Sequence, residues 1–338
     1  MRLIDAQHIR SSNLQLTKFI AAIMVIISHS FVLCTGSVSG DWIYRISDGQ
    51  LTMGYVAVSI FFLCGGFLIA KSAERLSTFS SYWKTRALRI FPPLFFTVIL
   101  CIVIGGLFLT QLPPKQYWTA PQTWRYLLNA LLIPQHELPG VFANAPYNST
   151  VNGSLWTLPV EFLCYIACFI FYKTGFLRKG KFCLTIPLAV ITTLFSFYVS
   201  DKIPTLFTAL SPCLFFYIGM TYYVYHDKII LNKKYFLMSV CLFVLFSVFH
   251  LHRLGMFLCF PYIMFTFWFG ARQLPRKLAY IGNFSYGIYL LGFPVQQTII
   301  YLFNNKISPL YNALFSIPLA VLTGALLYYI AEYRKKPN

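Results

Sequence analysis

Apolar residues gather in long runs along this sequence, and short polar segments separate one run from the next. A run of about twenty apolar residues matches the hydrocarbon thickness of a bilayer when it forms an α-helix. The pattern therefore predicts an all-α polytopic membrane protein with about ten transmembrane helices. The predicted spans are 13–34, 52–71, 89–111, 155–173, 182–200, 204–225, 235–251, 254–271, 280–303 and 309–331, of which 235–251 is short.

The composition of the chain agrees with this class. Hydrophobic residues make up 58% of the 338 residues and charged residues 11%, and the mean hydropathy is +0.65. These values exclude an ordinary soluble globular protein. The first apolar run is too long for the core of a signal peptide, contains Lys18 and His29, and lacks a small-residue cleavage site before the next hydrophilic stretch. We therefore expect it to remain as a helix.

Basic residues are distributed unevenly between the two sides of the predicted spans. With the N-terminus placed in the cytoplasm, 20 of the 27 lysines and arginines fall in inside segments and six in outside segments. This bias follows the positive-inside rule and predicts that both termini are cytoplasmic. Because the net charge of +18 is spread over six inside segments, no nucleic-acid partner is expected.

The longest stretch between predicted spans is 112–154, on the outer side. It contains an apolar piece, WRYLLNALLIP, which is too short to span the bilayer and is typical of an interfacial or re-entrant helix. Binding residues often collect in loops that a rigid scaffold positions. We therefore predict a single membrane domain, 1–338, with an outer lid at about 112–154.

Two ionisable residues, Lys18 and His29, lie inside the first predicted span. Ionisable groups are costly at membrane depth and mark candidate functional sites. Their separation of eleven residues returns nearly to the same helical face, about 16 Å further along the axis. His29 is a candidate general base or transient acyl carrier, and the alternative is a core histidine bonded to a neighbouring helix. Lys18 either contacts an anionic ligand or extends to the inner headgroups.

Four further residues are candidates for binding or catalysis. Arg86 and Arg89, three residues apart at the cytoplasmic mouth of the third span, suit the phosphates of an anionic cosubstrate or serve as positive-inside anchors. Glu161 lies a turn or two from the outer end of the fourth span, at the level expected for His29, where it would orient the imidazole, bind acceptor hydroxyls, assist proton transfer or face water. Trp156 belongs to an aromatic belt or to a sugar-stacking platform.

A metal site is not expected. His250 and His252 lie in a short outside turn, but residues two apart on a helix do not face each other, and the sequence offers no third ligand nearby. The nine cysteines fall within or at the ends of apolar spans without paired spacing in an outside loop, so they are given no metal or disulfide role.

Four patterns, in order along the chain, resemble segments of the acyltransferase-3 family of integral membrane acyltransferases. They are LTKFIAAIMVIISHS, with Lys18 in place of the family's arginine and His29 as its histidine; GYVAVSIFFLCGGFLIAKS; YWKTRALRIFPPLF, with Arg86 and Arg89 as an Arg-x-x-Arg motif; and NGSLWTLPVEFLCY, with Trp156 and Glu161. The segment IGNFSYGIYLLGFPV is similar to the family's penultimate helix, with Gly292 where a histidine is common. The resemblance covers essentially the whole chain.

The resemblance implies a membrane O-acyltransferase that transfers an acetyl group from cytoplasmic acetyl-CoA to a hydroxyl of a surface or lipid-linked polysaccharide. It implies catalytic roles for His29 and Glu161, donor binding by Lys18, Arg86 and Arg89, and acceptor binding by Trp156. Acetyl-CoA would be a cosubstrate rather than a permanently bound cofactor. The other partners would be a carbohydrate acceptor, such as lipopolysaccharide O-antigen, and the lipid of the bacterial inner membrane.

Two other classes of function remain open at this stage. A polysaccharide or lipid exporter would use buried polar groups to line a path, although no inverted repeat or pair of broken helices is visible in the sequence. A structural subunit of an envelope assembly complex would have no use for polar residues inside its spans.

Overall fold

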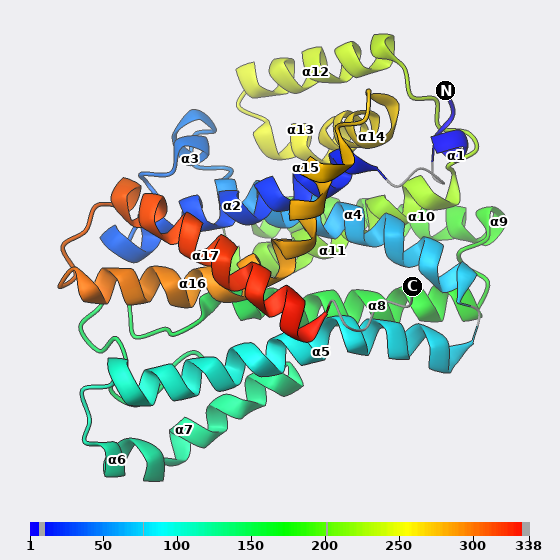
Figure 1. Ribbon diagram of the computed structural model, residues 1–338. Helices are drawn as coiled ribbons and strands as arrows, with labels where there is room; N and C mark the ends of the chain where they lie inside the picture. The colour runs from blue at the N-terminus through cyan, green and yellow to red at the C-terminus, as the bar shows by residue number, and fades with distance from the viewer. Residues whose placement is uncertain (7–10, 77, 201, 333–338) are drawn as a thin grey trace. The chain divides into compact units, whose positions relative to one another are not determined.

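Each of the ten predicted spans coincides with helix in the computed structural model (Figure 1). The structure describes residues 1–6, 11–76, 78–200 and 202–332. Within these residues, β-structure is limited to three isolated bridges, so the prediction of an all-α protein is confirmed.

The helices differ widely in length. In chain order they are α1 (Leu3–Ala6), α2 (Ser12–Thr35), α3 (Trp42–Ile46), α4 (Met53–Arg75), α5 (Phe79–Ile104), α6 (Pro114–Thr119), α7 (Pro121–Arg125), α8 (Thr157–Lys173), α9 (Lys179–Phe182), α10 (Ile186–Val199), α11 (Pro204–Val224), α12 (Lys233–Val248), α13 (His252–Leu258), α14 (Phe260–Phe265), α15 (Arg276–Tyr280), α16 (Ser285–Leu302) and α17 (Pro309–Ala331). Shorter 3-10 or π turns are η1 (Gly105–Leu109), η2 (Tyr126–Leu131), η3 (Gly153–Trp156), η4 (Cys183–Thr185), η5 (Thr266–Gly270) and η6 (Ile281–Phe284).

Seven helices in the described part of the chain are long and apolar enough to cross a membrane, or eight if the helix made of α13, α14 and η5, bent by 48°, is one span. The protein is therefore a multi-pass membrane protein. The other two predicted spans are α12, with 16 residues, and α16, whose 18 residues include Gln296 and Gln297. At 1.5 Å per residue α12 extends about 24 Å, less than the roughly 30 Å of hydrocarbon. The count of ten is not confirmed and, like the cytoplasmic termini, stays a prediction.

The helix α5 begins at Phe79, ten residues before the predicted third span. Hydropathy marks only the apolar part of a helix, whereas lysine and arginine are good helix formers that extend it through polar sequence. Arg86 and Arg89 therefore lie within α5, between one and three turns from its start.

The chain folds into two compact units, each built from segments far apart in sequence. The first unit comprises residues 1–18, 55–82 and 160–282, and the second comprises 19–54, 83–159 and 283 onward. The sequence boundaries between the units fall inside four long helices, α2, α4, α5 and α8, so each of these helices has residues in both units. The prediction of a single domain over 1–338 stays a prediction.

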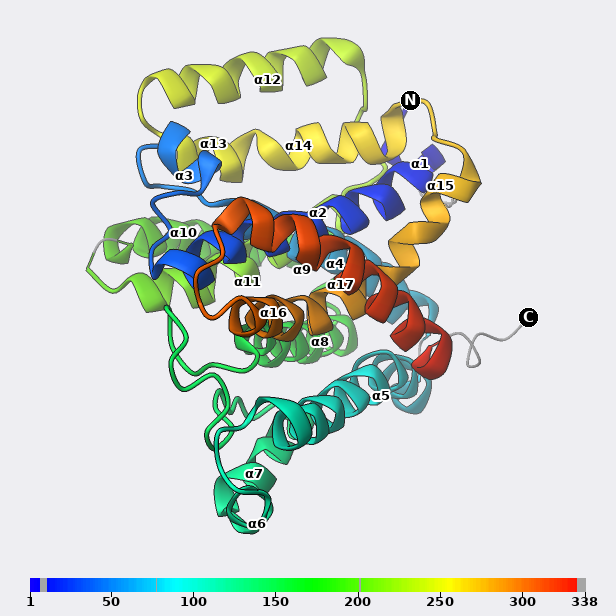
Figure 2. The same ribbon diagram turned by 60° about the vertical axis from the view of Figure 1, so that its left-hand side comes forward.

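In the first unit, α4 and α11 cross through paired glycines. A Cβ atom at Gly66 would lie 1.9 Å from the Phe216 carbonyl oxygen, and one at Gly219 would lie 2.1 Å from the Leu63 carbonyl oxygen. Helix backbones approach this closely only where a side chain is missing, a common device of membrane helices. Further along the chain, α12 lies alongside α13 and α14 (Figure 2).

In the second unit, α16 and α17 lie side by side in both ribbon views (Figures 1 and 2). Glycines again permit the contact, because a Cβ atom at Gly287 would lie 2.5 Å from the Gly324 carbonyl oxygen. The segment predicted as a lid begins with α6 and α7, and the Tyr117 hydroxyl on α6 donates to the Ile102 carbonyl of α5 at 2.9 Å. A Cβ atom at Gly106 would lie 2.4 Å from the Tyr117 ring, so η1 and α6 also pack tightly.

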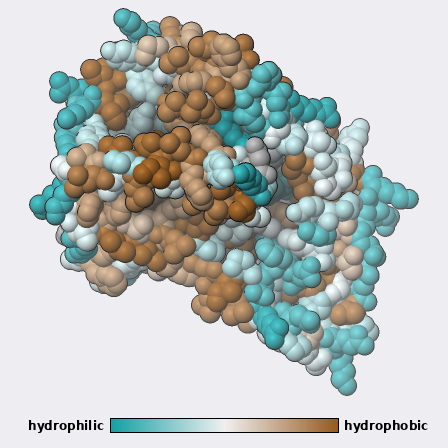
Figure 3. Space-filling model, turned by 180° about the vertical axis from the view of Figure 1, so that it is seen from behind, coloured by the Kyte–Doolittle hydropathy of each residue, from teal (hydrophilic) through white to brown (hydrophobic). Residues whose placement is uncertain are grey.

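Apolar side chains cover wide areas of the molecular surface (Figure 3). On α10, for example, Leu188 is 67% exposed, Ile191 is 62% exposed and Leu194 is 63% exposed. Exposed leucine and isoleucine at this density would be a liability in water, whereas lipid solvates them.

Candidate functional site

His29 lies on α2 in the second unit and packs against a phenylalanine of α16. Its ring meets that of Phe293 edge-to-face, with 5.3 Å between ring centroids and 74° between ring planes. The Nδ1 atom of His29 is buried and has no hydrogen-bond partner among the described residues. A buried polar atom without a partner costs about 1 to 3 kcal/mol, so each such atom calls for an explanation, and a role in proton exchange is one. This nitrogen is suited to exchange a proton with a bound substrate.

Three neutral polar side chains that are fully buried lie at the level of His29 along α2. Gln296 on α16 donates through Nε2 to the Ile26 carbonyl at 2.8 Å and to the Ser30 hydroxyl at 2.7 Å. The Ser30 hydroxyl also lies 3.0 Å from Oδ1 of Asn312 on α17, and Nδ2 of Asn312 donates to the Gln296 carbonyl at 3.1 Å. Gln296, Ser30 and Asn312 each have 0% exposure. These bonds fix α2, α16 and α17 together next to His29.

Gly292, one turn before Gln296, occupies the position where the family that the sequence resembles commonly has a histidine. A Cβ atom at Gly292 would lie 3.1 Å from Cγ1 of Ile26 on α2, which is tighter than most real contacts. The glycine therefore lets α16 approach α2 closely at the level of the polar set. A histidine here would require Ile26 to move.

A second buried amide of α16 holds the end of the predicted lid. Gln297 donates through Nε2 to the carbonyls of Asn148 at 3.2 Å and Thr150 at 2.9 Å. Because both partners are carbonyl oxygens, the amide nitrogen must face them, and the orientation of the side chain is determined. The Oε1 atom of Gln297 then points the other way, and it is buried with no donor in the described part of the chain.

The turn that leads to Trp156 is also fixed to α16. Asn152 donates through Nδ2 to the Leu290 carbonyl at 2.8 Å, and the Tyr289 hydroxyl donates to the Ser154 carbonyl at 3.0 Å. A Cβ atom at Gly153 would lie 2.7 Å from the ring of Phe293, the same ring that packs on His29. α16 thus contacts both the imidazole of His29 and the turn η3, which ends at half-buried Trp156.

Glu161 lies on α8 in the first unit and is half-buried. Its Oε1 atom accepts a hydrogen bond from the hydroxyl of Tyr165, one turn later on the same helix. Tyr165 is buried, and its carbonyl accepts from the Tyr82 hydroxyl at 3.0 Å. The carboxylate therefore has a fixed local partner, while its pairing with His29, a residue of the other unit, stays a prediction.

The three predicted donor-binding cations have different surroundings. Arg86 is buried, with 7% exposure, whereas Arg89, three residues later on α5, is exposed. An arginine that only marks the cytoplasmic side gains nothing from burial, because desolvating a charge costs free energy. Lys18, in the first unit, is half-buried, and its Nζ donates to Oε1 of Gln15 at 3.1 Å. Arg86 is therefore the stronger candidate for a specific anion contact.

A pocket of about 380 Å³ in the first unit was not singled out by sequence reasoning. Its lining residues are Glu74, Tyr172, Lys173, Leu177 and Arg178. Glu74 accepts from the Tyr223 hydroxyl, and two cations, Lys173 and Arg178, also line the cavity. The neighbouring ion pair of Lys179 with Asp227, at 2.5 Å, holds the pKa of that carboxyl below its usual value. In the sequence, these lysines and arginines were indistinguishable from ordinary positive-inside residues.

The buried amides were also missed by the sequence analysis. A search for titratable groups inside spans finds Lys18 and His29 but passes over Gln296, Gln297 and Asn312, which carry no charge. Their signal is nevertheless present, because amides within apolar runs pair across membrane helices.

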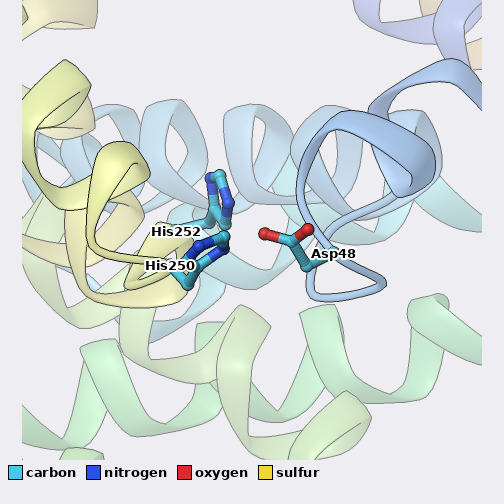
Figure 4. A group of neighbouring side chains, drawn as sticks. All are labelled: Asp48, His250 and His252. Atoms are coloured by element: carbon cyan, nitrogen blue, oxygen red, sulfur yellow. The ribbon is translucent and has the colours of Figure 1, made fainter.

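In the first unit, His250 lies in the turn that joins α12 to α13, and His252 is the first residue of α13. Figure 4 labels both, together with Asp48 of the second unit, which follows α3. Within their own unit the two histidines supply two ligands, fewer than the three or four protein ligands of a zinc site. That no metal binds to them stays a prediction from the sequence.

Comparison with known proteins identifies several relatives. Residues 11–329 match the sequence profile of a family described as an acyltransferase domain. An O-acetyl transferase of Shigella phage Sf6 is 28% identical over an alignment of 302 residues, and the match covers 86% of this chain and 86% of the phage protein. Nodulation protein 10 of Rhizobium leguminosarum bv. viciae is 29% identical over 167 residues, 46% of this chain and 42% of that protein. Acyltransferase MdmB of Streptomyces mycarofaciens is 30% identical over 123 residues, 36% of this chain and 29% of that protein. No solved structure matches the chain.

Proposed function

We propose that this chain, which belongs to the acyltransferase-3 family and is therefore a membrane acyltransferase, transfers an acetyl group from acetyl-CoA. The acceptor would be a hydroxyl of a surface or lipid-linked polysaccharide. The similarity to a phage O-acetyl transferase over 86% of both chains supports transfer to oxygen. The observation that carries the proposal is the buried Nδ1 of His29, which has no partner among the residues that the structure describes.

His29 would act as the general base. As the acceptor hydroxyl attacks the thioester carbonyl carbon, the imidazole takes the hydroxyl proton, and a new C–O bond forms. The C–S bond then breaks, and the imidazolium returns its proton to the departing thiolate, so the products are an O-acetyl ester and free CoA. The alternative role of His29 as a transient acyl carrier gives the same products by two transfers.

The remaining predicted site residues would bind the two substrates. Arg86 and Arg89 would hold the phosphates of acetyl-CoA on the cytoplasmic side, with Lys18 adding a third positive charge. Glu161 would orient the imidazole or accept from acceptor hydroxyls, and the indole of Trp156 would stack on a sugar ring. Much of the rate enhancement would come from holding thioester and hydroxyl together.

The proposed setting is the bacterial inner membrane. Both termini would be cytoplasmic, the segment 112–154 would form a lid over the outer face, and the acceptor, for example lipopolysaccharide O-antigen, would lie on that face. Acetyl-CoA would enter and leave as a cosubstrate, and the proposed reaction uses neither a metal nor nucleic acid.

The decisive experiment is mass spectrometry of surface glycans from cells that lack the gene and are complemented with variants. His29→Ala should remove the acetyl groups at wild-type protein level, because loss of a general base lowers the rate by about 10² to 10⁴. His136→Ala is the matched control, since His136 is exposed in the predicted lid and has no proposed role. Normal acetylation with His29→Ala would remove this residue from the chemistry. Loss of the polysaccharide itself, rather than of its acetyl groups, would indicate an exporter.

A further inference from the structure

The second unit contains a pocket of about 480 Å³ at the C-terminal end of α16 that none of the predicted site residues touches. Its walls come from Gln111, two residues after η1, and from the segments 142–145 and 301–305. The side chains that carry the argument are those of Gln111, Phe142, Asn144, Tyr301, Asn304 and Asn305.

The walls of this pocket are tied together by specific contacts. Asn305 donates through Nδ2 to the Asn144 carbonyl at 2.8 Å, which joins the end of α16 to the predicted lid. The rings of Phe142 and Tyr301 meet edge-to-face with 6.2 Å between centroids. The backbone N–H of Gln111 donates to the Gly140 carbonyl at 3.0 Å. Specific contacts therefore define the walls of the pocket. The side chains of Gln111 and Asn144 remain exposed at its edge.

The lining chemistry suits an uncharged sugar. Side-chain amides both donate and accept hydrogen bonds, as sugar hydroxyls do, and four amides face this pocket. Tyr301 supplies an aromatic surface and a polar tip of the kind that packs on a pyranose ring. Among the described lining residues none is charged, so a phosphate or a uronate would find no counter-charge.

The position of the pocket relates it to His29 through α16. Phe293, Gln297 and Tyr301 are spaced by four residues and share one helical face. Phe293 contacts His29, Gln297 holds the lid at 148–150, and Tyr301 lines the pocket. At 1.5 Å per residue, the pocket lies about 12 Å along α16 from the level of the imidazole. This is too far for the reacting hydroxyl and suits a sugar further along the same chain.

We propose that this pocket is a distal subsite for an uncharged sugar unit of the acceptor polysaccharide. The inference rests on the proposed function and deepens it, because it assigns the acceptor an oligosaccharide length and a neutral unit at this position. Binding at a distance from the reacting group positions the hydroxyl, and its free energy is used to bring the reactants together.

The test measures binding and turnover separately on the purified full chain in detergent. The binding probes are four neutral tetrasaccharides, one each of glucose, galactose, mannose and rhamnose. Tetragalacturonate is the charged probe. The main variant combines Gln111→Ala with Asn144→Ala, which removes two exposed amides and keeps the Asn144 carbonyl that Asn305 contacts. Gln122→Ala is the matched control, an exposed amide of α7 outside the pocket. Asn304→Ala serves as a second variant if the double variant fails to fold.

The expected result is saturable binding of at least one neutral tetrasaccharide, weakened about tenfold by the double variant, as befits two neutral hydrogen bonds, and unchanged by the control. Three outcomes would each overturn the subsite. The wild-type protein could bind none of the neutral tetrasaccharides, or it could bind tetragalacturonate as tightly as the neutral ones. The third is wild-type affinity for the neutral tetrasaccharide in both the double variant and Asn304→Ala. Because binding needs no turnover, the two proposals fail separately. Protein that binds the tetrasaccharide but releases no CoA thiol from acetyl-CoA keeps the subsite and loses the proposed transfer.

Discussion

At the scale of single residues, the two arginines of α5 show how position in the fold separates equivalent side chains. Arg86 and Arg89 are identical in type and three residues apart, yet Arg86 is 7% exposed and Arg89 lies open to solvent or headgroups. A guanidinium that is largely removed from water binds an anion more strongly than an exposed one, because solvent screens the exposed pair. The donor contact should therefore depend mainly on Arg86.

We predict that Arg86→Ala raises the apparent KM for acetyl-CoA by roughly 10 to 100-fold, the value of a lost charge-assisted hydrogen bond. Arg89→Ala should have a smaller effect, and Arg86→Lys should recover only part of the loss, since an ammonium does not reproduce the planar fork. Release of CoA thiol by inside-out membrane vesicles supplied with acetyl-CoA measures this. Lys84→Ala, an exposed cation of the same helix, is the control. An unchanged KM in the Arg86→Ala and Arg89→Ala double variant would make both residues topological anchors.

At the scale of elements, the close helix crossings explain where small residues are required. At Gly66 the obstacle to a side chain is the carbonyl of Phe216, a backbone atom that cannot rotate away. At the adjacent Gly65, a Cβ atom would meet only the Phe216 ring at an ordinary 3.7 Å. Two neighbouring glycines in one helix thus differ in whether the fold tolerates a methyl group.

Gly66→Ala should destabilise the first unit by about 1 to 3 kcal/mol, the usual cost of forcing extra volume into a packed contact. Gly65→Ala should be close to neutral, because the methyl group meets no obstacle and alanine has the higher helix propensity. Thermal unfolding of the detergent-solubilised protein, followed by size-exclusion chromatography of heated samples, compares the two. Equal melting temperatures would mean that α4 and α11 do not cross this tightly.

The sequence predicts the elements of this protein better than their contacts. All ten apolar runs are helical, because a long apolar segment satisfies its backbone hydrogen bonds internally when it forms a helix. The start of α5 was missed by ten residues because its first turns are polar. Gln296 and Asn312 could not be recognised as neighbours of His29, since a contact between α2, α16 and α17 depends on tertiary packing that periodicity does not encode.

At the scale of the whole molecule, α12 decides the topology. If α12 and the bent helix that follows it both cross the bilayer, the turn at His250 lies outside and the C-terminus lies in the cytoplasm. If α12 stays at the interface while the bent helix crosses, every later segment changes sides. The basic residues of each segment favour the first arrangement.

Reporter fusions test this topology in cells. Alkaline phosphatase fused after Phe249 should be active, because the enzyme requires an environment outside the cytoplasm, and the same enzyme fused after Asn338 should be inactive. A fluorescent protein fused after Asn338 should fluoresce as the reciprocal control. An inactive fusion after Phe249 would leave α12 at the membrane surface and would contradict the ten-span arrangement.

The side chains that fix α2, α16 and α17 beside His29 have a consequence for how the site responds to acidity. Ser30, Gln296 and Asn312 bind through hydroxyl and amide groups, none of which gains or loses a proton in the range where proteins fold. A carboxylate in their place would switch the geometry whenever it titrated. Here the support stays the same from acid to alkaline conditions, so the imidazole keeps its position.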